Sequence, residues 1–130
     1  DGVKIFDGDL KEFELADVKI LSEKVPLVKG TVNNGGSNIY ELATQNGAKV
    51  VMVAENTNNN NKEFFEFGVI DNGTDIFHTE YGNVRTGEQL IVPTFEKTAS
   101  GFARVNFDIG SSVTAGHNVV VTIVSNINKK

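Results

Sequence analysis

Residues 49–75, KVVMVAENTNNNNKEFFEFGVIDNGTD, decide the fold of this chain. One apolar run covers residues 50–54, and a second covers residues 64–70 beyond a tract of asparagines. Apolar residues occupy odd and even positions of both runs, which is typical of strands buried on two faces. The segment therefore predicts a hairpin inside the core of a β-sandwich, with strands at about 49–55 and 63–71. It carries no visible chemistry.

Turn-forming residues divide the remainder of the chain into further strands, which we predict at residues 75–81, 88–95, 102–109 and 118–125. The clearest period of two lies in residues 102–109, where apolar Val105 and Phe107 alternate with polar Arg104 and Asn106. We therefore expect an all-β fold, an antiparallel β-sandwich of the jelly-roll or immunoglobulin-like kind.

Composition limits the class of protein. A chain of 130 residues makes a single domain, and such a domain buries roughly two-thirds of its unfolded surface. The absence of cysteine excludes disulfides and thiol chemistry. The net charge of −5, with scattered Lys and Arg, disfavours nucleic acid as a partner.

Neither a membrane span nor a leader is expected. No apolar run is long enough to cross a bilayer. The chain opens at Asp1 without a signal-peptide pattern. The sequence leaves open whether the missing initiator Met reflects trimming, processing or renumbering.

The N-terminal stretch allows two interpretations. Residues 12–15 and 18–20 alternate as strands do, but the same stretch also fits a weak helix, and we favour strands. Pro26 cannot donate to a neighbouring strand, which fits a sheet edge or an arm, and Gly35-Gly36 follow as a hinge. We divide the single domain into arm or edge strands (1–38) and a sandwich body (39–130). The first 30 or so residues are expected to engage another subunit.

The sequence around the two histidines predicts neither an acid–base pair nor a metal site. Alternation places His78 and Glu80 on the strand face opposite Phe77 and Tyr81, where an acid–base pair is conceivable. Residues two apart on a strand are roughly 7 Å apart, however, which disfavours a direct bond. His117 is expected to be a solvated turn residue, and two separate histidines give no zinc signature.

Acidic turns offer candidate calcium ligands, and neither group matches the spacing of an EF-hand loop. The two groups are Asp7, Asp9 and Glu12, and Asp71, Asn72 and Asp75. We interpret both as turns, including Asn72-Gly73-Thr74, which is also a glycosylation pattern. Ser111 and Ser112 have no nearby His and Asp in a nucleophile context. We therefore assign no catalytic, cofactor or metal residue and predict a protein that is not an enzyme and needs no cofactor.

Exposed aromatic rings offer a different function, because sugars stack on flat rings. Tyr40 and Tyr81 are the residues most suited to such a platform. This gives the alternative of a carbohydrate-binding or adhesive module.

From about Leu42 onward the order of elements resembles small β-sandwich structural proteins of tailed-bacteriophage virions. The resemblance rests on four segments: 51–57 (VMVAENT), 64–71 (FFEFGVID), Glu88-Gln89-Leu90-Ile91-Val92-Pro93, and 109–121 (IGSSVTAGHNVVV). The last segment is similar to the corresponding passage of decoration, cement and tail-associated proteins, although His117 stands where such proteins often have Asp. The resemblance implies a location in the virion and contacts with the major capsid protein or other virion proteins. It also implies a homo-oligomer without catalytic residues.

Overall fold

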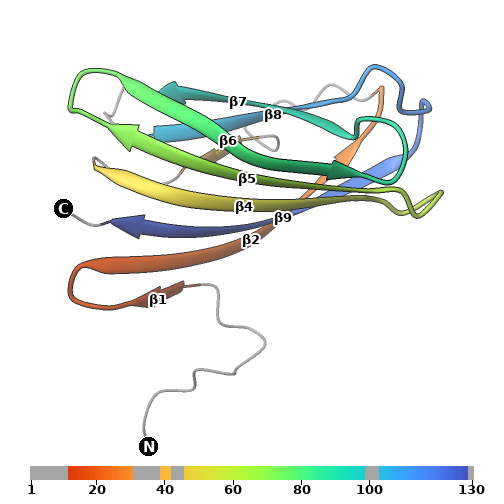
Figure 1. Ribbon diagram of the computed structural model, residues 1–130. Helices are drawn as coiled ribbons and strands as arrows, with labels where there is room; N and C mark the ends of the chain where they lie inside the picture. The colour runs from red at the N-terminus through yellow and green to blue at the C-terminus, as the bar shows by residue number, and fades with distance from the viewer. Residues whose placement is uncertain (1–11, 31–38, 42–45, 99–102, 129–130) are drawn as a thin grey trace, which may run out of the picture.

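The computed structural model describes residues 12–30, 39–41, 46–98 and 103–128, which form two antiparallel sheets of a β-sandwich (Figure 1). The larger sheet has the order β1-β2-β9-β4-β5-β6, and the smaller has the order β3-β8-β7. The strands are β1 (Glu12–Glu14), β2 (Val18–Val28), β3 (Ile39–Glu41), β4 (Gly47–Asn56), β5 (Lys62–Asp71), β6 (Ile76–Arg85), β7 (Ile91–Lys97), β8 (Ala103–Ile109) and β9 (Asn118–Asn128). The predicted all-β sandwich is confirmed. None of these residues forms a helix that could cross a membrane.

The hairpin predicted at residues 49–71 is the central pair β4–β5. Val50 lies opposite Phe67 and Met52 opposite Phe65, and β4 pairs with β9 on its other side. The inward residues of both strands, Val50 and Met52 on β4 and Phe65 and Phe67 on β5, are buried in the core. On the outer face Val53 is 39% exposed and Ile70 is 63% exposed, so the expected burial of both faces is wrong for the outer face.

The core lies between the sheets and takes side chains from both. Phe67 is 3% exposed, and its ring centroid lies 5.6 Å from that of Phe65 and 5.0 Å from that of Phe95 on β7. The larger sheet also contributes Val25, Leu27, Val50, Met52, Ala54, Val69, Val119, Val121 and Ile123, and the smaller sheet contributes Ile91, Ala103, Val105 and Phe107. Phe65, Phe67 and Val69 thus form the inward face of β5, and the predicted alternation of residues 102–109 is confirmed, with Val105 and Phe107 in the core.

The N-terminal strands belong to this chain's own sheet. β2 pairs with β9 from Val18 to Val28, and it buries Val25 and Leu27 in the core. The described part of the N-terminal stretch is thus made of edge strands and not of a helix or a detached arm. Residues 1–11 and 31–38, which include the expected Gly35-Gly36 hinge, lie outside the described residues. Contact of this stretch with another subunit stays a prediction.

Pro26 lies in the part of β2 that has a neighbouring strand on one side only among the described residues. β1 lies beside only the first part of β2, with Glu12 opposite Leu21. Among the described residues, positions 22–28 of β2 therefore have a neighbouring strand on one side only. A proline fits this position because it has no N–H to donate.

Candidate functional site

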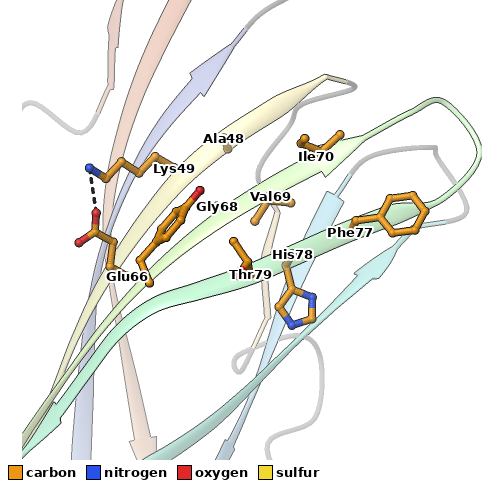
Figure 2. A pocket seen from close by; sticks show the side chains of 10 residues that line it. Ala48, Lys49, Glu66, Gly68, Val69, Ile70, Phe77, His78 and Thr79 are labelled. Atoms are coloured by element: carbon orange, nitrogen blue, oxygen red, sulfur yellow. Dashed lines mark ion pairs between the residues drawn. The ribbon is translucent and has the colours of Figure 1, made fainter.

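An open groove lies on the outer face of the larger sheet. Its volume is about 720 Å³, within the range of about 300–1,000 Å³ common for small-molecule sites. Strands β4, β5 and β6 line it with Ala48, Lys49, Glu66, Gly68, Val69, Ile70, Phe77, His78, Thr79 and Tyr81. Figure 2 shows Ile70 and Phe77 at one end and the ion pair of Lys49 and Glu66 at the other. We call this site the outer groove.

A β-bulge aims Tyr81 over the floor of the outer groove. Glu80 lies opposite Phe67 and Gly82 opposite Glu66, so Tyr81 is an extra residue in β6 without a partner in β5. Bulges commonly redirect a side chain in this way. The Tyr81 ring occupies the space above Gly68, where an added Cβ atom would lie 2.8 Å from the tyrosine hydroxyl. The absence of a side chain at Gly68 therefore leaves the space that the Tyr81 ring occupies.

The walls of the outer groove are apolar and open to solvent. The exposed fractions are 63% for Ile70, 56% for Phe77 and 67% for Tyr81. Single exposed apolar residues are ordinary, but three that share one groove mark a surface suited to contact with another molecule.

A pair of opposite charges provides the polar side of the outer groove. Lys49 Nζ lies 2.8 Å from Glu66 Oε1 across the β4–β5 pair. The hydrogen bond to Glu66 and the attraction of its negative charge raise the pKa of Lys49 above its ordinary value. The groove thus presents an ammonium group and a carboxylate whose charges cancel.

A second, smaller hollow continues the outer groove across the sheet. It has a volume of about 320 Å³ and shares Ala48 and Lys49 with the outer groove. Its other lining residues are Val18, Gly47, Asn126 and Asn128. The Asn128 Oδ1 atom accepts a hydrogen bond of 3.1 Å from Asn46. We call it the amide hollow.

The opposite end of the same outer face carries an exposed apolar row. Val53 lies opposite Phe64, and Phe64 lies opposite Val84. Val84 is 66% exposed and Val53 is 39% exposed. On the β9 side of Val53 the row ends at Thr122. We call Val53, Phe64 and Val84 the distal row.

The predicted face of His78 is consistent with the structure, but no acid–base site forms there. His78 packs with its ring centroid 4.6 Å from that of Phe95 and 6.2 Å from that of Phe67. Among the described residues no hydrogen bond or ion pair joins His78 to Glu80. The histidine therefore packs at the rim between the two sheets.

The second group of candidate calcium ligands forms a hairpin turn held by its own hydrogen bonds. Lys97 Nζ lies 2.6 Å and 2.7 Å from the two carboxylate oxygens of Asp71, and Asp71 also accepts the Gly73 N–H. Asn72 Oδ1 accepts the N–H groups of Thr74 and Asp75. The turn prediction is confirmed, and the described residues contain no acidic or histidine cluster arranged for a metal ion. Asp7 and Asp9 lie outside the described residues.

The Asp71–Lys97 pair joins the two sheets. Asp71 ends β5 in the larger sheet, and Lys97 ends β7 in the smaller sheet. The hydrogen bond from Lys97 holds the pKa of the Asp71 carboxyl below its ordinary value, against the opposing effect of burial, and the Gly73 N–H adds to the lowering. The ionised Asp71 carboxylate thus links the larger sheet to the smaller one through Lys97.

Glu63 is a second buried carboxylate, which the sequence analysis did not single out. It is 1% exposed, and its Oε1 atom accepts hydrogen bonds from the N–H groups of Leu90 and Ile91. Asn83 donates to Oε2 over 3.0 Å. Since these donors satisfy the carboxylate, Glu63 fastens the start of β7 to β5. β7 itself begins at Ile91, later than the predicted start at residue 88.

Residues 56–61, which contain the asparagine tract, form a hydrogen-bonded turn that contacts His117. His117 was expected to be a solvated turn residue, and this contact corrects that expectation. Asn56 is fully buried, and its Nδ2 atom lies 3.1 Å from His117 Nδ1. Asn58 accepts the Asn118 N–H, and Asn61 donates to Glu88. The tract therefore ties the β4–β5 turn to the loops before β7 and β9.

The remaining candidates do not join a site in the described residues. Ser111 and Ser112 are exposed in the turn after β8. Tyr40 lies opposite Val105 in the β3–β8 pair, and its side chain is outside the described part of the structure. Of the two tyrosines proposed as a sugar platform, Tyr81 alone can be assessed, and it lies in the outer groove.

No protein-family model matches the chain, and no curated protein sequence matches it. Among solved structures, the chain is similar to the tailspike protein of Acinetobacter phage vB_ApiP_P1, with a TM-score of 0.49 and 13% sequence identity. The match covers 99% of this chain and 25% of the tailspike, so the chain spans about a quarter of that protein's length. We transfer no residue role from it.

Proposed function

We propose that this chain is a non-enzymatic structural protein of a phage virion, a capsid decoration, cement or tail-associated protein that acts through protein–protein contacts. The observation that carries the proposal is the distal row on the outer face of the larger sheet. The sequence resemblance to virion β-sandwich proteins supports the location.

The distal row has the properties of a contact surface. Val84, Phe64 and Val53 occupy adjacent positions on β6, β5 and β4, and the two valines are exposed to solvent. Covering apolar surface stabilises a complex by roughly 25 cal/mol per Å². An ion pair between Lys62 and Glu55 borders the row, which resembles the polar rim of a protein interface.

The proposed partners are the major capsid protein or other virion proteins, together with further copies of the same chain. A repeated surface protein gains firm attachment from many modest contacts made at once. Purified alone, the chain should therefore bind weakly, yet it should occupy assembled particles stably. No catalytic turnover is part of this function.

The test is to locate the chain on purified particles of its source phage by immunogold labelling and particle reconstruction. Regularly placed copies on the particle support the proposal, and its absence from intact particles would overturn it. Val84→Lys should reduce occupancy, because a charge would be buried in the contact. Thr94→Lys, on the outer face of the smaller sheet, is the control and should leave occupancy unchanged.

A further inference from the structure

The Tyr81 ring lies over the backbone of β5 at Gly68. The bulge in β6 directs it over β5, and the bare backbone at Gly68 lets the ring approach the sheet. Despite this support the side chain is 67% exposed, so the ring remains open to solvent. A positioned ring loses little conformational freedom on binding, which favours affinity.

The polar groups beside the ring suit hydroxyl groups. A sugar hydroxyl both donates and accepts hydrogen bonds. The Glu66 carboxylate accepts and the Lys49 ammonium group donates, and both line the outer groove with Tyr81. Since their charges cancel, the pair favours a neutral ligand over an anionic or cationic one.

The amide hollow extends the same chemistry along the sheet. Asn126 and Asn128 line it, and it meets the outer groove at Lys49. Amide side chains supply both donors and acceptors. The ligand suited to the whole surface is therefore longer than one sugar ring, with an apolar face near Tyr81 and Phe77 and hydroxyl groups toward the asparagines.

We propose that the outer groove and the amide hollow together bind a neutral oligosaccharide, with the Tyr81 ring as its stacking platform. Lys49 and Glu66 hydrogen-bond the hydroxyl groups of the sugar that stacks on the ring. This inference is independent of the proposed virion contact, which uses the distal row at the other end of the face.

The experiment screens the full chain on an array of neutral and acidic bacterial surface oligosaccharides, followed by titration calorimetry with the strongest neutral probe. We expect Tyr81→Ala to weaken binding by about tenfold or more, the loss typical of an aromatic stacking contact. Tyr81→Phe keeps the ring and should retain most of the affinity. Val92→Ala removes an exposed valine from the smaller sheet and should not change binding.

Each remaining outcome decides against the proposal. Binding of no neutral probe on the array overturns it, as does neutral binding that Tyr81→Ala leaves intact. A preference for acidic probes overturns the assignment of a neutral ligand. If Tyr81→Ala alters sedimentation of the free chain and no sugar binds, the groove is a protein contact. Thermal melting of each variant confirms that the fold is retained. Loss of particle occupancy in Val84→Lys is a separate result and bears on the virion proposal alone.

Discussion

A Cβ atom on Gly68 would lie 2.8 Å from the hydroxyl oxygen and 2.9 Å from the Cε2 atom of Tyr81. The two residues thus share one space, which the ring fills because residue 68 has no side chain. The atoms that would collide belong to the end of a flexible side chain, so the ring can swing away while the backbone stays in place. Gly68 therefore controls the position of Tyr81 without controlling the fold.

Gly68→Ala is expected to displace the Tyr81 ring while changing the free energy of unfolding by about 1 kcal/mol or less, the size of strand-propensity effects. The chain has two tyrosines and no tryptophan. In a Tyr40→Phe background, tyrosine fluorescence reports on Tyr81 alone, and its quenching by iodide should increase. Gly82→Ala is the matched control, because an added Cβ atom there meets open space. Equal quenching in both variants would show that Gly68 does not position the ring.

Phe67→Ala should lower the free energy of unfolding by about 3–5 kcal/mol, as is usual for truncation of a buried phenylalanine. Phe67 contacts the rings of Phe65 and Phe95, so the truncation leaves a cavity between the sheets. Phe77→Ala removes the same atoms from a side chain that is 56% exposed, and should cost far less. Denaturant midpoints measure both. Similar midpoints for the two variants would contradict the assignment of the core face.

Asp71 and Lys97 are expected to respond unequally to substitution. Lys97→Met leaves the fully buried Asp71 carboxylate without its cation and should cost about 3 kcal/mol or more. Asp71→Asn leaves Lys97, whose side chain is 21% exposed and can regain water, and should cost less. The order of the two melting temperatures at pH 7 is the measurement. The reverse order would show that desolvation of the lysine dominates.

The same pair predicts a dependence on pH. The pKa of Asp71 is lowered in the folded state from an ordinary value of 3.8. Its stabilising effect is therefore complete above the unfolded value and is lost as the pH falls through and below 3.8. Asp71→Asn should lose less stability than the parent chain on acidification from pH 5 to pH 2.5. Parallel stability curves would exclude Asp71 as a source of the acid sensitivity.

The sequence predicted the fold well because its signals are local. The apolar runs at residues 50–54 and 64–70 predicted two core strands, and β4 and β5 are central strands of the larger sheet that bury their inner faces. Pro26 is also a local signal, since its missing N–H cannot donate to a neighbouring strand, and among the described residues its part of β2 has a neighbour on one side only. Such signals depend on each segment's own residues.

The candidate site could not be predicted because it depends on register. Alternation places Tyr81 on the same face as Phe77, and both line the outer groove. The bulge opposite Glu66 and Phe67, which brings the ring over Gly68, cannot be located from alternation. Nothing in the sequence indicated that Gly68 is covered by the Tyr81 ring. Likewise, Asn56 and His117 are 61 residues apart, and only pairing of β4 with β9 brings them together.

Deletion of residues 1–30 is expected to abolish cooperative folding of the isolated chain. It removes β2, which leaves β9 unpaired along one side and takes Val25 and Leu27 from the core. Loss of two buried aliphatic side chains costs about 2–5 kcal/mol each. That loss is comparable with the whole stability of a small domain, about 5–15 kcal/mol. Deletion of residues 1–11, which removes none of the described strands, is the comparison. Thermal unfolding followed by circular dichroism should show a cooperative transition for the shorter deletion and none for the longer one. A cooperative transition in both would mean that β2 is dispensable and acts as a detachable arm.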